Sequence, residues 1–380
     1  MTERSERGGS HRDDRGGRGY RGGSGGGDRG YRGGSGGDRG GGGRGGDRGY
    51  RGGDRGYRDG ERGRSRRVYD DEPRDGLLAD LVGHLHALDG RSYAAYKAIV
   101  GRYRAPAGWF LHIDRVQADP YAPPTRIHVD VPTDLHGLEL LDEADLLADA
   151  DRRLAVGDFL TRELHAGFRG TALSIASPGQ EILQRSSIIV RPDEKKEGPG
   201  WVLEVRARLA LPAQGRSIQG HEASRIVGRD LVRELEEAMD LTGERGDRLV
   251  RHIATLEDHR DLTATVARNG WVSFLADGSV LPRRSGVSDE PLDGGVPLEA
   301  PESMAATVEL PHAGTVRGTV VEAGVNVIVG GGYHGKSTLL SAIERGVYPH
   351  VPGDGRELVA TVPDAVKVRA ADGRAVTGVD

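Results

Sequence analysis

Cysteine is absent from this chain of 380 residues, and aromatic side chains make up only 5% of it. The lack of cysteine excludes disulfide bridges, thiolate nucleophiles and cysteine-ligated zinc sites. No stretch approaches the roughly 20 consecutive apolar residues that a membrane-spanning helix requires. The first residues, Met1–Glu6, also lack the apolar core of a signal peptide. These absences predict a cytoplasmic protein with no membrane partner.

Aliphatic side chains are nearly missing from residues 1–67, which contain 27 of the 61 glycines. This segment holds 18 of the 53 Lys and Arg residues and 10 of the 58 Asp and Glu residues, a net charge of +8. The remaining 35 basic and 48 acidic residues give residues 68–380 a net charge of −13. A segment with so little apolar surface cannot offset the entropy cost of ordering. We therefore expect a disordered, basic, Gly/Arg-rich tail on an acidic folded body.

A seven-residue unit recurs in this tail at residues 28–34, 47–53 and 54–60, first as Asp-Arg-Gly-Tyr-Arg-Gly-Gly. The unit resembles the RGG-type segments of RNA-associated proteins, because arginine contacts phosphate and tyrosine stacks on bases. The predicted contacts for single-stranded RNA are Arg29, Tyr31, Arg32, Arg48, Tyr50, Arg51, Arg55, Tyr57 and Arg58. The interspersed aspartates leave two other interpretations open, a solubilising linker and a self-associating low-complexity arm.

Residues 68–215 are predicted to form an N-terminal mixed α/β domain. Apolar residues recur at helical spacing over 77–88 and again over 93–103, which predicts two helices. Residues 109–114 and 127–131 alternate between apolar and polar, which predicts two strands. A helical pattern over 146–164 and strand-like runs at 173–176, 187–190 and 201–211 follow.

Each of the two alternating strands carries His-x-Asp on its polar side, as His112/Asp114 and His128/Asp130. Pairing of the strands would bring two imidazoles and two carboxylates onto one face of the sheet, which is a candidate metal constellation. The alternative is a solvated face on which each histidine pairs with a neighbouring acid.

Residues 216–380 are predicted to form a second domain, which begins with an amphipathic helix over 226–239. A hairpin is expected from residues 271–276 and 279–281 around the turn Asp277-Gly278. The basic pair Arg283-Arg284 follows in a loop, where it would contact phosphate or RNA, or else be a solvated loop tip or pair with internal carboxylates. Strands are predicted at 306–310, 315–321 and 325–329.

A complete G-x-x-x-x-G-K-[ST] motif spans nine residues: Gly330, Gly331, Gly332, Tyr333, His334, Gly335, Lys336, Ser337 and Thr338. It lies between the predicted strand at 325–329 and an amphipathic segment at 337–344 that is predicted to be helical. Backbone N–H groups and the positive end of a helix make such a loop an anion site. We predict that all nine residues bind ATP, with the Lys336 ammonium on the β- and γ-phosphates and the Ser337 hydroxyl on Mg²⁺.

Five stretches, at residues 111–117, 211–216, 276–286, 330–338 and 351–357, carry a wider resemblance. Through them the chain resembles the family of soluble predicted ABC-class ATPases found mainly in bacteria, over residues 77–380. The resemblance implies that residues 216–380 are part of an ABC-type ATPase domain. Family members continue past the position of Asp380 with the acidic Mg²⁺ partner, the catalytic carboxylate, the signature loop and the switch histidine. We therefore expect hydrolysis, by a head-to-tail homodimer, only for a complete protein, and no catalytic residue is assigned here.

Two other functions remain open from the sequence. One is a non-enzymatic module that binds RNA or forms condensates and retains a relic phosphate loop. The other is a different phosphate-loop phosphotransferase, such as a small-molecule kinase, whose turnover would depend on an acceptor substrate.

Overall fold

The computed structural model describes residues 74–194, 196 and 200–368. The chain divides into two units, residues 1–65 and 66–380, and every described residue belongs to the second. The predicted disorder of residues 1–67, together with the nine candidate RNA contacts in that tail, lies outside the described residues.

A seven-stranded sheet forms the first part of this unit, in the order β1-β2-β3-β4-β7-β5 with β6 also paired to β7. Its strands are β1 (Arg74–Leu77), β2 (Gly101–Arg104), β3 (Phe110–Arg115), β4 (Thr125–Pro132), β5 (Leu173–Ser174), β6 (Ile188–Pro192) and β7 (Trp201–Leu209). Strands β3 and β4 confirm the predicted alternation, since Leu111, Ile113 and Val129 are at most 1% exposed. The remaining side chains of each strand therefore lie on the opposite, polar face.

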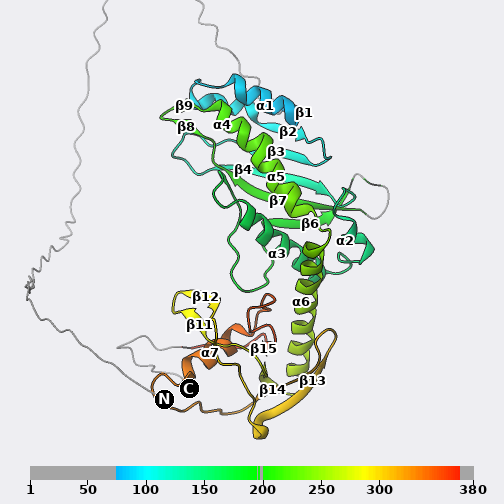
Figure 1. Ribbon diagram of the computed structural model, residues 1–380, viewed down its shortest axis with the longest axis vertical. Coiled ribbons are helices and arrows are strands. Elements are labelled where there is room, and N and C mark those ends of the chain that lie inside the picture. Colours follow the sequence, from blue (N-terminus) through cyan, green and yellow to red (C-terminus); the bar gives the residue numbers. More distant parts are fainter. Residues whose placement is uncertain (1–73, 195, 197–199, 369–380) are drawn as a thin grey trace, which may run out of the picture. The chain divides into compact units, whose positions relative to one another are not determined.

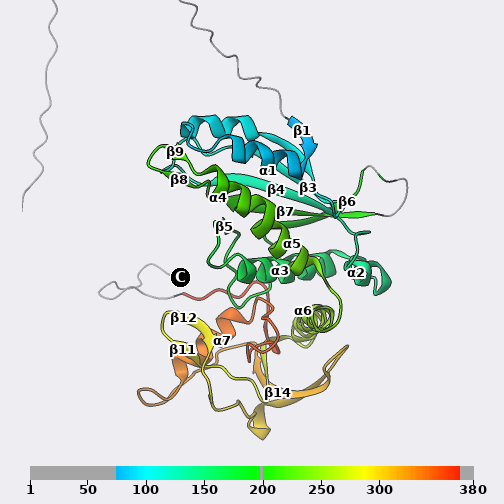
Figure 2. The same ribbon diagram turned by 45° about the horizontal axis from the view of Figure 1, so that its top comes forward.

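Helices cover the apolar face of this sheet (Figures 1 and 2). They are α1 (Leu78–Ala87), α4 (Gly220–Arg225), the π-helical turn η2 (Ile226–Asp230) and α5 (Leu231–Met239), while α2 (Glu139–Glu143) and α3 (Ala150–Gly167) precede β5. Helix α3 begins where the Asp149 carboxylate accepts a hydrogen bond from Arg152 N, at 2.9 Å. The predicted amphipathic helix at 226–239 is confirmed, although it starts earlier, at Gly220.

The helix expected over residues 93–103 was a wrong prediction. Residues Tyr93–Ile99 form a 3₁₀ helix, η1, and the chain then enters β2, which contains Tyr103. Gly101 has φ 154°, and a Cβ at this position would lie 2.3 Å from Arg74 O. Close pairing of β2 with β1 therefore ends the helical run.

A second, four-stranded sheet has the order β13-β14-β10-β15. Its strands are β10 (Trp271–Ala276), β13 (Ala305–Leu310), β14 (Gly314–Glu322) and β15 (Val359–Thr361). The long helix α6 (Glu244–Arg268) leads into it, and the α6 residues Leu262 and Val266 are buried against Phe274 of β10. The smaller elements are the strand pairs β8 (Ala213–Gln214) with β9 (Ser217–Ile218) and β11 (Arg283–Ser285) with β12 (Ser288–Pro291), the 3₁₀ turn η3 (Glu302–Met304) and helix α7 (Lys336–Arg345).

The hairpin expected between residues 271–276 and 279–281 is also corrected. Strand β10 pairs with β14 and β15, and residues 279–281 are not a strand. The Asp277 carboxylate accepts a hydrogen bond from Ala300 N at 2.6 Å and pairs with Arg317, so the chain leaves the sheet at the turn.

The described part of the second unit is mixed α/β, as predicted. Within it, no helix combines the length and the apolar character needed to cross a membrane.

Candidate nucleotide site

The phosphate loop has the backbone conformation that its glycines permit. Gly335 immediately precedes α7 with φ 80°, in the left-handed region, and Tyr333 also has a positive φ of 62°. Helix α7 then begins at Lys336, with Leu339 N donating to Gly335 O at 2.9 Å. The first N–H groups of a helix have no partner within the helix. The loop therefore delivers the chain to a helix whose amino-terminal end can receive an anion.

The strand expected at residues 325–329 is not formed. Strand β14 ends at Glu322, and residues 325–330 have no regular secondary structure. Val325 is 96% exposed and Val329 is 81% exposed. A strand needs a neighbour for its backbone N–H and C=O groups, and the described residues offer none to this segment. The predicted helix at 337–344 is confirmed by α7.

The Lys336 ammonium folds back over the loop. Its Nζ donates to Gly330 O at 2.7 Å and to Gly331 O at 2.5 Å. Ser337 is exposed at the first turn of α7, and Tyr333 and His334 are exposed at the loop's tip. The structure thus brings the nine predicted residues together on one loop and one helix end.

A polar cavity of about 410 Å³ adjoins the first two turns of α7. Three hydroxyl side chains of α7 reach it, from Ser337, Thr338 and Ser341. The other lining residues are Gln180, Glu181, Arg283, Ser285, Gly286, Ser288, Asp289, Arg345, His350 and Arg356. Three arginines and two acids line it, and Arg345 is paired with the lining acid Glu181.

Arg283 belongs to a buried network in the wall of this cavity. Its Nη2 donates to Asp354 Oδ2 at 2.6 Å and its Nη1 to Asp354 O at 2.9 Å. His350 Nδ1 lies 2.8 Å from the same carboxylate oxygen, and Arg356 donates to Leu281 O. Burial acts to raise the pKa of Asp354, but His350 and Arg283 outweigh it and hold that pKa below its usual value.

Arg356 is only 3% exposed, and burial together with repulsion from Arg283 lowers its pKa to about 10. The guanidinium still remains charged at neutral pH. Arg284, in contrast, is an exposed side chain 2.5 Å from Glu290. Arg283 thus pairs with an internal carboxylate, which is one of the alternatives for the basic pair, and contact of Arg283 or Arg284 with phosphate or RNA stays a prediction.

Four of these residues were missed by sequence reasoning: Arg345, His350, Asp354 and Arg356. Residues 351–357 were noticed as a family-like stretch, but nothing in them showed that Asp354 would be buried against Arg283, 71 positions earlier. Arg345 is the last residue of α7 and pairs with Glu181 at 2.6 Å. Only the three-dimensional structure shows that these four residues lie near the cavity.

Two family models match this chain. Residues 78–241 match the model described as the N-terminal part of ATPases of the ABC class, and residues 245–380 match the ABC ATPase P-loop domain. Among curated proteins, an uncharacterized protein of Methanocaldococcus jannaschii is 30% identical over 129 residues. That alignment covers 32% of this chain and 29% of the relative, so the chain spans well under two thirds of the relative's length.

Proposed function

Since the chain belongs to the family of ABC-class ATPases, we propose that it binds ATP with Mg²⁺ at the phosphate loop of residues 330–338. Family membership supports ATP-binding or ATPase function. The observation that supports binding at residues 330–338 is the left-handed conformation of Gly335, which is followed directly by α7. This arrangement presents free backbone N–H groups, the Lys336 ammonium and the Ser337 hydroxyl at one place.

Each group would have a distinct task. Triphosphate oxygens would replace the loop carbonyls as acceptors for Lys336 Nζ, because hydrogen bonds between two charged groups are stronger than those to a neutral carbonyl. The Ser337 hydroxyl is a hard oxygen ligand for Mg²⁺. Arg356, which lines the cavity beside α7 and donates to the backbone carbonyl of Leu281 rather than to a carboxylate of the described residues, would favour the negative charge of the bound nucleotide.

We propose that hydrolysis, in which water attacks the γ-phosphorus and the bond to the β-phosphate oxygen breaks, requires carboxylates beyond the phosphate loop. The acids lining the cavity are Glu181, which is paired with Arg345, and Asp289. No catalytic role is assigned to either. A head-to-tail pair of ATPase domains would complete the site in the manner implied by the family resemblance.

Calorimetric titration of the full chain with ATP in the presence of Mg²⁺ tests nucleotide binding. We expect Lys336→Ala to weaken binding by about tenfold or more, since a charge-assisted hydrogen bond contributes roughly 1.5–3 kcal/mol. Lys97→Ala, which removes an exposed lysine from η1, is the matched control and should bind as the wild type does. Equal affinities for all three proteins would refute a nucleotide site at this loop.

As a second function, we propose that the Arg/Tyr/Gly repeats of the tail bind single-stranded RNA and that nucleotide binding is coupled to it. The repeated pairing of arginine with tyrosine supports this proposal. Affinity for a uridine oligonucleotide should fall steeply as salt is raised, because bound phosphates release counterions. A flat salt response would remove this mechanism.

Measurements of RNA affinity and of ATP turnover separate this proposal from the two other functions that the sequence leaves open. RNA affinity that persists in Lys336→Ala and ignores ATP would favour a non-enzymatic RNA-binding module. ATP turnover that appears only when an acceptor compound is added would favour a phosphotransferase.

A further inference from the structure

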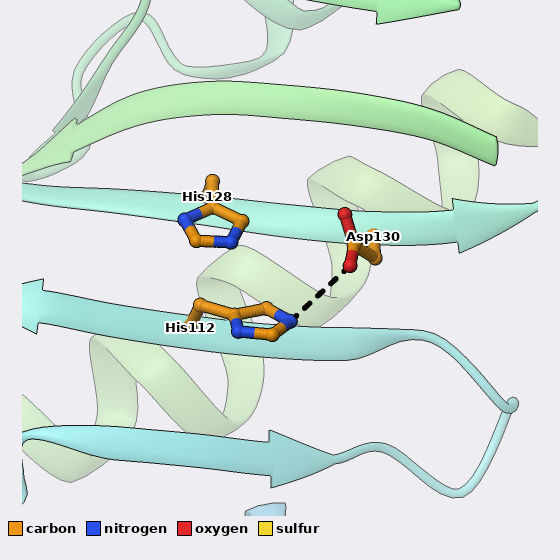
Figure 3. A group of neighbouring side chains, drawn as sticks. All are labelled: His112, His128 and Asp130. Atoms are coloured by element: carbon orange, nitrogen blue, oxygen red, sulfur yellow. Dashed lines mark ion pairs between the residues drawn. The ribbon is translucent and has the colours of Figure 1, made fainter. Parts of the chain in front are cut away.

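A group of titratable side chains, His112, His128 and Asp130, lies on the polar face of the seven-stranded sheet (Figure 3). The register of β3 and β4 places His112 directly opposite His128 and Phe110 opposite Asp130. The side chains of the three residues are 20%, 25% and 16% exposed, respectively. The sheet therefore presents two imidazoles and one carboxylate at a single, partly buried point.

His112 directs one ring nitrogen at Asp130. Its Nε2 is buried and lies 3.3 Å from Asp130 Oδ2 (Figure 3). This separation is slightly longer than that of a typical N–H···O hydrogen bond. A metal ion between the two atoms would be bound by both of them.

His128 is held with one nitrogen available. Its Nδ1 lies 2.9 Å from Asp114 Oδ2. An ionised carboxylate can only accept, so in the neutral ring Nδ1 carries the proton and Nε2 keeps its lone pair. Figure 3 shows a ring nitrogen of His128 on the side that faces His112 and Asp130. A carboxylate behind a histidine is the usual outer partner of a metal-binding imidazole.

Asp130 is oriented in a comparable way. Arg191 Nη2 donates to its Oδ1 at 2.8 Å, which leaves Oδ2 directed at His112. Asp114 and Arg191 thus position two of the three side chains without using the atoms that face one another.

We propose that His112 Nε2, His128 Nε2 and Asp130 Oδ2 bind a divalent transition-metal ion of the zinc type. Zinc lies roughly 2.0–2.2 Å from nitrogen and oxygen ligands, so two ligands of a tetrahedral site are about 3.3 Å apart. The observed separation of His112 Nε2 and Asp130 Oδ2 is 3.3 Å. One ligand atom from each of the three residues lies within 4.8 Å of the others, so a small rotation of the imidazoles, whose rings are stacked 4.1 Å apart, closes the site.

The ligand chemistry selects the metal class. Imidazole nitrogen suits zinc, copper, iron and nickel, whereas Mg²⁺ and Ca²⁺ take oxygen ligands. Three protein ligands leave one position open on a four-coordinate ion. Water would occupy the fourth position.

Nearby charges oppose and assist the ion. Arg206 of the neighbouring strand β7 is paired in register with His128, but its guanidinium is 2.7 Å from Glu204. Arg102 of the neighbouring strand β2 is paired in register with His112, and its guanidinium lies 3.8 Å above the Phe110 ring. These cations lower the affinity for a dication, while the carboxylates of Asp114, Asp130 and Glu204 raise it. The competing arrangement is two metal-free His–Asp pairs, and titration distinguishes the two.

Calorimetric titration of the full chain with ZnCl₂ tests the site, on protein purified without a histidine tag. We expect one equivalent to bind. His112→Ala and His128→Ala should each weaken binding by more than the roughly 10–100-fold that loss of an outer partner costs. Asp130→Asn should also weaken it, while its amide oxygen can still accept from Arg191. Circular dichroism and thermal unfolding of each variant verify that it folds.

The matched control removes another close pair of histidines. His86 and His221 have Nδ1 atoms 2.8 Å apart, so His86→Ala/His221→Ala deletes two imidazoles elsewhere on the chain and should retain the bound equivalent. With Co²⁺ in place of Zn²⁺, the visible absorption band should appear in the wild type and in this control but not in His112→Ala. Absence of heat for both metals, or binding that is unchanged in His112→Ala and His128→Ala, would overturn the proposal.

Discussion

Acid should destabilise this protein through two histidines buried on α6. His252 is 3% exposed and His259 is 1% exposed. Burial, with Arg162 and Arg185 nearby, lowers the pKa of His252 to about 3, and burial lowers the pKa of His259 to about 4. Both stay neutral in the folded protein at pH values where an unfolded histidine, with a pKa near 6.5, takes up a proton.

The sign follows from proton uptake by the unfolded chain. Between pH 6.5 and the folded-state pKa values, the unfolded state binds more protons, so the free energy of unfolding falls as the pH falls. At pH 5 the unfolded pKa lies about 1.5 units above the pH, which corresponds to about 2 kcal/mol for each histidine. Together they should remove about 4 kcal/mol between pH 7 and pH 5, a large part of the stability of a typical domain.

The surrounding contacts suggest the variant to use. His252 Nε2 lies 3.2 Å from Asp158 Oδ2, and His259 Nε2 donates to Gly346 O at 3.1 Å. Glutamine places an amide nitrogen near the position of Nε2 without titrating. His252→Gln/His259→Gln should therefore be less stable at pH 7, yet lose about 4 kcal/mol less than the wild type on going to pH 5.

Urea unfolding at pH 7 and pH 5 measures the stability at pH 7 and the stability that is lost between the two pH values. His136→Gln is the control, because the His136 side chain is 96% exposed, and it should lose as much stability as the wild type. If the double variant loses the same stability between the two pH values as the wild type, the two histidines do not carry the acid sensitivity and the reasoning fails.

Other substitutions have expected costs. Gly335→Ala should reduce ATP affinity and stability by about 1–2 kcal/mol, because φ is 80° there, whereas Gly83→Ala, in open space on α1 with no positive φ and outside the phosphate loop, should reduce neither. Asp158→Ala should cost about 3–5 kcal/mol in urea unfolding, since two arginines would lose their carboxylate; a cost below 1 kcal/mol would contradict a structural role for the network. Asp354→Ala should cost a similar amount and lower the thermal midpoint. Leu111→Ala, a fully buried truncation, should cost about 2–5 kcal/mol, and a near-neutral result would argue against the packing described.

Local patterns predicted the elements whose neighbours are close in sequence. Strands β3 and β4 pair with each other, and the alternation of apolar and polar residues along both is sufficient to show which side is buried. The same pattern placed His112, His128 and their acids on one face. It did not show which atoms would face one another, because Arg191, which orients Asp130, comes from β6, 61 positions later.

Long-range pairing accounts for the failures. Residues 93–103 have helical spacing, but the last of them belong to β2, which pairs with β1. The residues of β1 have no strand pattern of their own. Strand β10 pairs with β14 and β15 and not with the adjacent residues 279–281. Strand β15 lies more than 80 positions further along the chain. A pattern read in a short window cannot contain those partners.

Helix α7 is held firmly at one end only. At its carboxyl end, Thr361 Oγ1 donates to Ile343 O at 2.7 Å, His259 donates to Gly346 O, and Arg345 pairs with Glu181. These contacts connect the helix to β15, to α6 and to the segment after β5. At its amino end, residues 330–335 are exposed, and their hydrogen bonds to Lys336 and Leu339 stay within the loop and α7. A helix anchored in this way presents its N–H groups at a defined position, so a bound phosphate would gain an already positioned set of donors at little ordering cost.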